Sequence, residues 1–486
     1  MKHARLLSMI GFGCLFALLL TACAPTANDP TDQSEPSAQE TAAALAMMEQ
    51  AGAILRDCTS YTKETTLQLS GDGALSVTGT ERTTATNWND ITLVFDSVLE
   101  LSVTEETEKG QSLTSIRERE IFKGNKMVYS YEELRNEKTV ADRQLFSSMN
   151  RKAFREYRDQ LAQGAVLTEN TCAVASRQQN ADGTWSATYS GLSGEGAWYW
   201  SQSALLRFLP SEITVADVTL TIQYTADGTP IRVECIPTLV SSDAEATLPT
   251  VNVTTLYKDV NATSQELWFS LDGYTEVSGL HMARLAEALI ANRLSVGELQ
   301  VSSDGFLTYF LESTRKWENI HQTLTVSHKG GAFSYSLTES GKVLDQYENG
   351  NRTTTRNGQS LQAPTTETAA MLQLLRQLSG GIGLYNVAEV HAYDEIAETA
   401  DGVGTGTRCY EFTMADGMDE NARALVEQVG GRVESAEWTI TLKITNGQIT
   451  ACESIVDMMV WQYVEAMGAL AECSTIISTA TIYSAS

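Results

Sequence analysis

Apolar and polar residues alternate along most of this chain, in runs that turn residues interrupt at short intervals. Leu99, Leu101 and Val103 point to one side of an extended run, and the polar residues between them point to the other. Gly124-Asn125 separates two such runs, as in a β-hairpin. Strands of this two-sided kind predict antiparallel sheets that have one face against a core and the other in water.

A few segments have the spacing of amphipathic helices instead. The apolar positions predict helices over residues 40–57, 148–162, 199–209, 279–293, 364–379 and 419–429. Strands are predicted at 184–190, 216–225, 230–240 and 250–257, and from residue 387 to the end. Because so few helices must cover so many strands, broad curved sheets with helices against the concave side are expected.

One pattern of elements occurs twice. Gln160–Leu167 aligns with Gln377–Leu384 at an offset of 217 residues, and Val218–Tyr224 aligns with Trp438–Ile444 at an offset of 220. Several matches in the same order indicate a duplicated unit. The sequence therefore predicts an α+β protein with two tandem curved antiparallel β-sheets (half-barrels), each with helices packed on its concave face. The two units are expected over residues 41–262 and 279–486.

The first 22 residues have the order of an export signal. Lys2 and Arg5 precede the apolar stretch Leu6–Leu20, and the sequence LTAC that ends at Cys23 matches a lipobox. Residues 1–22 are therefore predicted to be a lipoprotein signal peptide, and Cys23 the lipidation site. A secretory signal with a chance cysteine and an uncleaved anchor helix are the alternatives. Acyl chains anchor a protein firmly, at about 0.8 kcal/mol per buried CH₂.

Residues 23–40 are small, polar or proline-rich and predict a flexible tether. The chain has 34 basic and 61 acidic residues. Removal of the signal peptide takes away Lys2 and Arg5, which leaves 32 basic and 61 acidic residues and a net charge of −29. So acidic a surface argues against nucleic-acid binding and against flat adsorption to anionic lipid. The expected location is the extracytoplasmic face of the cell membrane, or the outer membrane if the cell has two. Ala24 stands where inner-membrane retention favours aspartate.

Six cysteines remain after the lipidated one, and none belongs to a CxxC pair: Cys58, Cys172, Cys235, Cys409, Cys452 and Cys473. Buried free thiols are expected, and a zinc site is not. A disulfide between Cys452 and Cys473, facing each other across a hairpin, is the alternative left open.

Catalytic and metal motifs are missing from the sequence. There is no GxSxG, Walker loop or HExxH. His321 and His328 are seven residues apart along a predicted strand and would face opposite sides. The glycines of 402–406 precede a strand, which favours a hairpin loop over a phosphate site. Neither an enzyme nor a cofactor nor a bound metal is predicted, although an active site assembled from scattered polar residues stays open.

The densest aromatic patch is Trp198-Tyr199-Trp200, which apolar residues follow as far as Leu209. Large aromatic side chains suit the lining or rim of an apolar pocket. They are also the side chains most often buried in an ordinary core, here under a lid helix. Trp198, Trp200 and Phe208 are the candidate ligand-binding residues.

The lipobox at Cys23, the tether, the amphipathic helix and the many-stranded antiparallel sheet with inserted helices together resemble the LolA-like lipoprotein-carrier superfamily. That group includes periplasmic lipoprotein carriers and mycobacterial lipid-binding lipoproteins. The resemblance covers both units and implies half-barrels that hold acyl chains between sheet and helices. This chain differs in its two copies and in its own anchor, so a shuttling role is not implied.

The leading hypothesis is a membrane-anchored extracytoplasmic lipoprotein that binds a lipid or other apolar ligand. The alternative is a non-enzymatic scaffold or protein-binding lipoprotein of the cell envelope. An interior filled completely by its own side chains would favour the alternative.

Overall fold

The computed structural model describes residues 36–485, apart from 150–166, 168–171, 242–246, 397–405 and several shorter gaps. The signal peptide, Cys23 and most of the tether therefore lie outside the described residues, as does nearly all of the predicted helix 148–162. The predicted helix 419–429 is described only in part.

Twelve strands form sheet A. They are β1 (Ser60–Ser70), β2 (Leu75–Thr86), β3 (Val94–Thr107), β4 (Gly110–Lys123), β5 (Lys126–Arg135), β6 (Lys138–Ser148), β7 (Cys172–Gln179), β8 (Trp185–Leu192), β9 (Ile213–Tyr224), β10 (Pro230–Ser241), β11 (Thr250–Lys258) and β12 (Thr275–Glu276). Their order in space is β12-β6-β5-β4-β3-β2-β1-β11-β10-β9-β8-β7. Neighbours are antiparallel except for the two-residue β12, which pairs in parallel with β6.

Eleven strands form sheet B. They are β13 (Leu299–Leu311), β14 (Thr314–Lys329), β15 (Ala332–Glu339), β16 (Lys342–Glu348), β17 (Asn351–Arg356), β18 (Gln359–Pro364), β19 (Val387–Ile396), β20 (Gly406–Met414), β21 (Arg432–Thr445), β22 (Gln448–Val464) and β23 (Ala469–Ala485). Their order is β18-β17-β16-β15-β14-β13-β23-β22-β21-β20-β19.

The two sheets share one connectivity. Adding twelve to each strand number of sheet A, β12 aside, reproduces the order of sheet B. The aligned segments Val218–Tyr224 and Trp438–Ile444 accordingly lie in the equivalent strands β9 and β21. The fold class is confirmed as α+β, with curved antiparallel sheets and few helices, while the domain limits 41–262 and 279–486 stay a prediction.

The described helices are α1 (Ala38–Asp57), α3 (Gly194–Ser201), α4 (His281–Ser295) and α5 (Glu367–Ser379), with 3₁₀ turns η1 (Leu206–Phe208) and η2 (Leu384–Asn386). The helix predicted over 199–209 is wrong in its bounds, because α3 begins earlier and η1 is a separate turn. Leu209 is extended, with ψ of 138°. The following proline disfavours helical geometry at this residue and so ends η1 there.

Helix α1 shows how local sequence sets an element. Its N-terminus is a capping box, in which the Ser37 hydroxyl accepts from the Glu40 N–H at 3.3 Å and the Glu40 carboxylate accepts from the Ser37 N–H at 2.9 Å. One face then packs on β7 and β8 of sheet A: Tyr189 donates from its hydroxyl to the Ala44 carbonyl at 2.7 Å.

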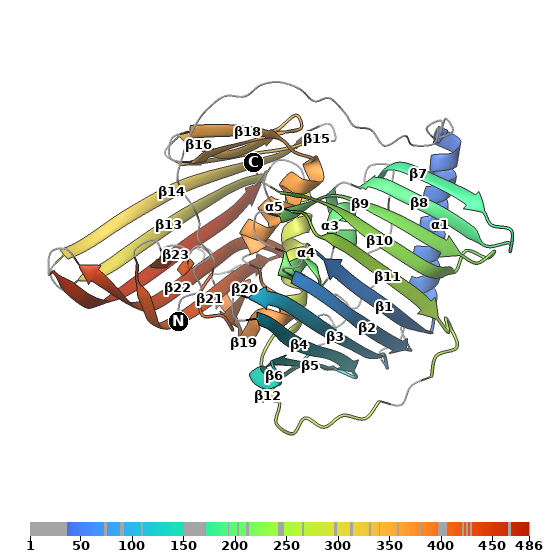
Figure 1. Ribbon diagram of the computed structural model, residues 1–486, viewed down its shortest axis with the longest axis horizontal. Coiled ribbons are helices and arrows are strands. Elements are labelled where there is room, and N and C mark those ends of the chain that lie inside the picture. Colours follow the sequence, from blue (N-terminus) through green and yellow to red (C-terminus); the bar gives the residue numbers. More distant parts are fainter. Residues whose placement is uncertain are drawn as a thin grey trace.

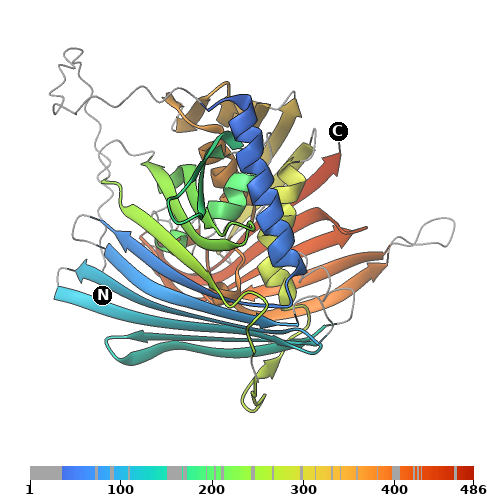
Figure 2. The ribbon, with the colours of Figure 1, turned by 90° about the vertical axis from the view of Figure 1, so that its right-hand side faces the viewer.

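The other helices lie between the two sheets (Figures 1 and 2), where the blue-to-green strands of sheet A and the yellow-to-red strands of sheet B flank them. Helix α5 belongs to the second half of the chain but contacts β9 of sheet A, and α4 contacts β22 of sheet B as well as α3 and α5. The Thr366 hydroxyl, just before α5, donates to the Ala216 carbonyl at 2.7 Å. The Thr368 hydroxyl of α5 donates to the Leu192 carbonyl at 2.5 Å. Both sheets therefore share one apolar core.

The disulfide left open by the sequence is absent. Cys473 pairs in register with Val460, whereas Cys452 pairs with Thr481, so the two cysteines lie at different levels of the same hairpin. All six cysteines of the described chain are buried free thiols. The hairpin strands are 17 residues long, and a register set by such a long pairing separates cysteines that a shorter hairpin would bring together.

Burial should make these thiols unreactive. It raises the pKa of Cys58 to about 11, and those of Cys235 and Cys452 to about 12, so little thiolate exists at neutral pH. We expect iodoacetamide at pH 8 to leave all six unmodified in the folded protein and to label all six in denaturant, as measured by peptide mass mapping. Rapid labelling of any one of them in the folded state would contradict this packing.

Candidate ligand site on the inner face of sheet A

The aromatic patch lies in the helical layer. Trp198 and Trp200 are on α3 and Phe208 is on η1, and all three are partly buried against the shared core. Arg207 lies over the Phe208 ring at 5.2 Å and over the Tyr385 ring at 4.8 Å, so Phe208 belongs to a contact between the two halves. Both indole Nε1 atoms are buried without a hydrogen-bond partner in the described structure.

An indole N–H that is buried without an acceptor costs free energy, on the order of 1–3 kcal/mol. Two of them on one short helix are unusual, since buried polar groups nearly always find partners.

Sheet A carries polar residues where its alternation predicts apolar ones. Strand register aligns two rows of inward-facing residues across the strands. One row is Tyr257, Lys63, Thr83, Ser97, Glu120 and Tyr129, and the next is Thr255, Thr65, Glu81, Leu99, Glu118 and Tyr131. We call these two rows the polar belt. On either side the rows are mostly apolar: Tyr61, Ala85, Phe95, Phe122 and Met127, and Val253, Leu67, Gly79, Leu101 and Ile116.

Much of the polar belt is internally paired. The Ser97 hydroxyl donates to Glu81 at 3.1 Å, and the Lys63 ammonium lies 3.6 Å from the same carboxylate. Glu118 accepts from the Tyr129 hydroxyl at 3.0 Å and forms an ion pair with Arg207 at 2.5 Å. These contacts hold two carboxylates in fixed positions under the helices.

Two charged groups of this region are not paired in this way. The Glu120 Oε1 atom is buried and has no hydrogen-bond partner among the described residues. Arg284 of α4 is within electrostatic reach of Glu120, Glu81 and Glu118, but forms no ion pair within 4.0 Å in the described part of the chain. Arg284 itself is exposed.

The pKa shifts agree with this arrangement. Burial raises the pKa of Glu120 to about 6; Arg284 and Lys63 oppose the rise, and Glu81 and Glu118 add to it. Burial would also raise the pKa of Glu81, but Lys63, Arg284 and the Ser97 hydroxyl outweigh it and leave that pKa below its ordinary value. Of these two neighbouring carboxyls, Glu120 therefore takes up a proton at a higher pH, around 6, than Glu81 does.

Side chains that face the helices remain partly accessible. The Lys63 and Glu81 side chains are 28% and 30% exposed, and Tyr61, Tyr199 and Tyr257 are partly buried rather than buried. Protein atoms surround each of them closely enough that burial is the largest influence on the pKa values of Glu81 and the three tyrosines. Partly accessible side chains therefore lie on the face of sheet A that is turned toward Tyr199 of α3 and Arg284 of α4, and we call this region the inner space.

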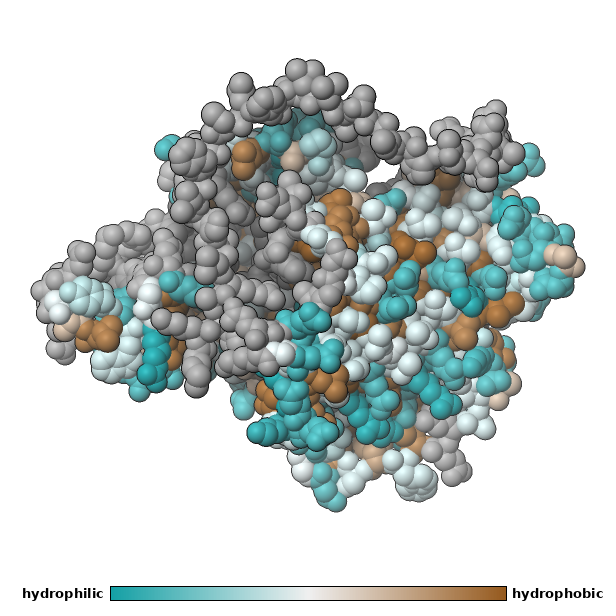
Figure 3. All heavy atoms as spheres, viewed as in Figure 1, coloured by the Kyte–Doolittle hydropathy of each residue, from teal (hydrophilic) through white to brown (hydrophobic). Residues whose placement is uncertain are grey.

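Two depressions lie elsewhere, on the outer face of sheet A. One has a volume of about 660 Å³ and is lined mostly by outward-facing residues of β1 to β5, such as Thr66, Thr80 and Arg117. The other has about 590 Å³ and lies beside Arg82, Asp96 and residues 259–264. Hydrophilic and hydrophobic residues are intermixed over the strands of sheet A in Figure 3. These depressions lie on the face that is open to water, and no unpaired buried group points into them from the described residues.

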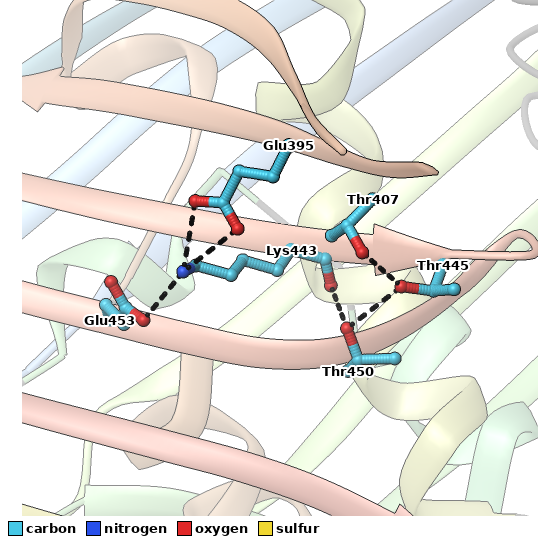
Figure 4. Close-up of polar contacts among 6 residues, drawn as sticks. All are labelled: Glu395, Thr407, Lys443, Thr445, Thr450 and Glu453. Atoms are coloured by element: carbon cyan, nitrogen blue, oxygen red, sulfur yellow. Dashed lines mark hydrogen bonds and ion pairs between the residues drawn. The ribbon is translucent and has the colours of Figure 1, made fainter. Parts of the chain in front are cut away.

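Sheet B offers a useful contrast. In Figure 4, Lys443 lies between Glu395 at 3.3 Å and Glu453 at 3.1 Å, while Thr445 contacts the hydroxyls of its neighbours on both sides. Every group drawn has a partner on another strand of sheet B, and the Lys443–Glu395 pair reaches from β21 across β20 to β19, so this cluster ties strands together. The described inner face of sheet B is apolar and buried, at Trp438, Ile440, Leu442, Val456, Met458 and Val460.

The described residues contain neither a cluster of metal-binding side chains nor a helix that could span a membrane. No three of their His, Cys, Asp or Glu side chains are grouped to hold a metal ion. Burial lowers the pKa of His281 to about 4, so its ring is neutral at pH 7, and it packs against Tyr410. None of the helices in this part of the chain is both long and apolar enough to cross a bilayer.

Sequence reasoning identified the aromatic part of this region and missed the charged part. The sequence alone did not single out Lys63, Glu81, Glu120 and Arg284, because a chain with so many charged residues offers many such positions. A usable signal existed in the strands: charges at positions that alternation assigns to the core, in register on β1, β2 and β4. Arg284 carried no such signal, since its place opposite the belt depends on how α4 packs.

Comparison with known proteins leaves the chain without a family. No family model and no curated protein matches it. Among solved structures it is similar to a β-barrel-like protein from Brucella abortus (8% identity, 43% of this chain and 99% of that one, TM-score 0.21). It is also similar to the Mycobacterium tuberculosis lipoprotein LppX (11% identity, 46% of this chain and 98% of that one, TM-score 0.22). Each neighbour spans about half of this chain, but TM-scores this low carry no functional argument.

Proposed function

We propose that this protein is an extracytoplasmic lipoprotein that is anchored in a membrane through lipid on Cys23 and binds a lipid or other apolar ligand. The site would be the inner space between sheet A and helices α3 and α4. The observation that carries the proposal is the partial exposure of side chains, such as Lys63 and Glu81, that face helices rather than bulk solvent.

The inner space has the composition of a site for an amphiphile. Apolar rows of sheet A flank the polar belt, and Tyr199 of α3, which contacts the Trp200 ring at 5.3 Å, lies within electrostatic reach of Tyr61 and Tyr257 on this face of the sheet. An acyl chain along the apolar rows would gain about 0.8 kcal/mol for each CH₂ removed from water.

The rival function, a scaffold or protein-binding lipoprotein, calls for a filled interior, whereas Lys63 and Glu81 stay 28% and 30% exposed on the inner face of sheet A. An enzymatic role is not proposed. Glu120 has the raised pKa of a general acid or base. However, no three His, Cys, Asp or Glu side chains of the described residues are grouped to hold a metal ion.

A brominated fatty acid tests the proposal, because bromine quenches a tryptophan only in close contact. Mature protein, purified with its anchor in non-ionic detergent, is titrated with mid-chain dibromostearate or with unbrominated stearate. We expect saturable quenching by the brominated acid alone, and loss of most of it in the Trp198→Phe/Trp200→Phe double variant. Tryptophan fluorescence is the measurement.

The matched control is Trp268→Phe, since Trp268 is 85% exposed on the segment between the halves. This variant should keep the quenching of the unmodified protein. Absence of saturable quenching, or quenching that survives the loss of both Trp198 and Trp200, would rule out ligand binding in the inner space.

A further inference from the structure

We infer that the depression of about 660 Å³ on the outer face of sheet A is a second ligand site, and that it binds an uncharged oligosaccharide. The inner space lies on the opposite face of the same sheet, so the two sites are separate. A volume of this size is within the range of ligand pockets in proteins.

The depression is a groove that crosses the strands. Strand register places its outward-facing side chains in two parallel rows. One row is Thr66, Thr80, Glu100, Arg117 and Glu132, and the other is Gln68, Thr78, Ser102, Ser115 and Leu134. The residues between the rows point to the core, so strand backbone forms the floor of the groove. Five strands at their usual spacing give it a length of ~19 Å.

A glycine shapes the middle of this floor. A side chain at Gly79 would overlap with the Glu100 carbonyl and with Leu101 on the neighbouring strand. Strands β2 and β3 therefore approach each other more closely here than a larger residue would permit. Glycine inside a strand often marks the close approach of another backbone or of a ligand.

Hydroxyl and amide groups supply most of the lining. Six such side chains belong to the two rows: Thr66, Gln68, Thr78, Thr80, Ser102 and Ser115. Five of them are exposed, and Ser102 is half-buried. None of the six forms a hydrogen bond through its side chain within the described part of the chain. Each can both donate and accept, as the hydroxyls of a sugar do. The lining therefore matches a ligand that carries many hydroxyl groups.

The charged residues of the groove favour a ligand without charge. Arg117 pairs with Glu100 at 3.4 Å, and these side chains are 61% and 60% exposed. Glu132, beside Arg117 in register, adds one carboxylate, so the lining carries an excess negative charge that repels anionic ligands. A cationic ligand gains little, because exposed ion pairs contribute little free energy. Sugar hydroxyls can donate to the two carboxylates and accept from the guanidinium group.

Other classes of ligand fit this groove poorly. A peptide that adds to a sheet needs an unpaired strand edge, whereas β1 to β5 have neighbouring strands on both sides. A helical peptide needs an apolar groove, and every residue of the two rows except Leu134 is polar. The acidic chain repels nucleic acid. An uncharged oligosaccharide is the class that satisfies both the shape and the lining.

Isothermal titration calorimetry tests the site on the mature protein in a polyoxyethylene detergent, which has no sugar head group. The probes are three uncharged tetrasaccharides, namely cellotetraose, maltotetraose and N-acetylchitotetraose, and the anionic tetragalacturonate. We expect at least one uncharged probe to bind at one site per chain, and tetragalacturonate to bind at least tenfold more weakly than it. Binding of none of the three, or tighter binding of tetragalacturonate, would overturn the inference.

A double variant then locates the site. Thr78→Val/Thr80→Val removes one hydroxyl from each side of the groove and keeps the shape of both side chains. Affinity for the uncharged probe should fall about tenfold, the effect of losing two hydrogen bonds. The matched control is Thr238→Val, since Thr238 is exposed on β10 outside the groove. This control should bind as the unmodified protein does. Valine suits strands, so urea unfolding should show both variants folded. Full affinity in the double variant would place the saccharide elsewhere and refute the site.

Dibromostearate distinguishes this site from the inner space. The saccharide and the brominated acid should bind together, each with the affinity it has alone, and the double variant should keep its tryptophan quenching. Competition between the two ligands would contradict separate sites. Loss of saccharide binding with quenching intact would refute the outer site alone, whereas saccharide binding without quenching would refute the proposed function alone.

Discussion

Residues 36–262, expressed without the rest of the chain, are expected not to fold cooperatively. Helix α5 from the second half contacts β9 of sheet A, and Thr368 donates to the Leu192 carbonyl. Helix α4, which faces the polar belt, is also lost. Exposing even ~500 Å² of apolar surface would cost about 12 kcal/mol. That cost equals the whole stability of a typical domain.

Urea unfolding followed by circular dichroism measures this effect. The full mature chain should show a cooperative transition, and the first half a broad or absent one. Supplying residues 263–486 as a second chain should restore the transition, because the missing helices return with it. A sharp two-state transition from the first half alone would show that sheet A does not depend on the shared core.

Replacing Arg352 with methionine is expected to lower the free energy of unfolding by about 3–5 kcal/mol. Arg352 of β17 binds Asp345 of β16 through two hydrogen bonds of 2.9 and 2.6 Å. Their side chains are only 13% and 10% exposed. Arg352 also donates to Gln373 of α5. Its loss leaves a buried carboxylate whose remaining described contact is the Tyr335 hydroxyl at 3.2 Å.

The matched control is Arg232→Met. Arg232 pairs with Glu234 on the surface, with side chains 41% and 39% exposed, and a pair of that kind contributes about 0–1 kcal/mol. Chemical denaturation of both variants gives the comparison. The double variant Asp345→Leu/Arg352→Met should recover most of the loss, because no unpaired buried charge remains. Equal stability of the two single variants would contradict the role assigned to this pair.

Elements whose signals are local were predicted well. Helix α1 was expected at 40–57 and lies at Ala38–Asp57. The prediction is close because the capping residues and the apolar face of this helix all belong to one short segment of the sequence. Strands β9, β10 and β11 agree with prediction for the same reason, since period-two alternation needs no distant partner.

Predictions that depended on long-range geometry were less successful. The disulfide between Cys452 and Cys473 assumed a hairpin register that the 17-residue strands do not have. The helix predicted at 199–209 ran two elements together, because the apolar spacing continues across the turn at residues 204–205 that precedes η1. Among the candidate ligand residues, Trp198 and Trp200 are partly buried on α3 and stay a prediction, while Phe208 lies with Arg207 at a contact between the halves.

By itself, the sequence determined the two-sided strands, most helix positions and the repeated order of elements, since hydrophobic period and turn residues act over a few neighbours. Only the tertiary structure decided that α5 of one half covers the sheet of the other, and that Arg284 comes within electrostatic reach of Glu120. Such relations join distant residues: the hydrogen bonds from α5 and its start to sheet A span 150 and 176 positions. They follow from how curved apolar surfaces pack together, which no local pattern records.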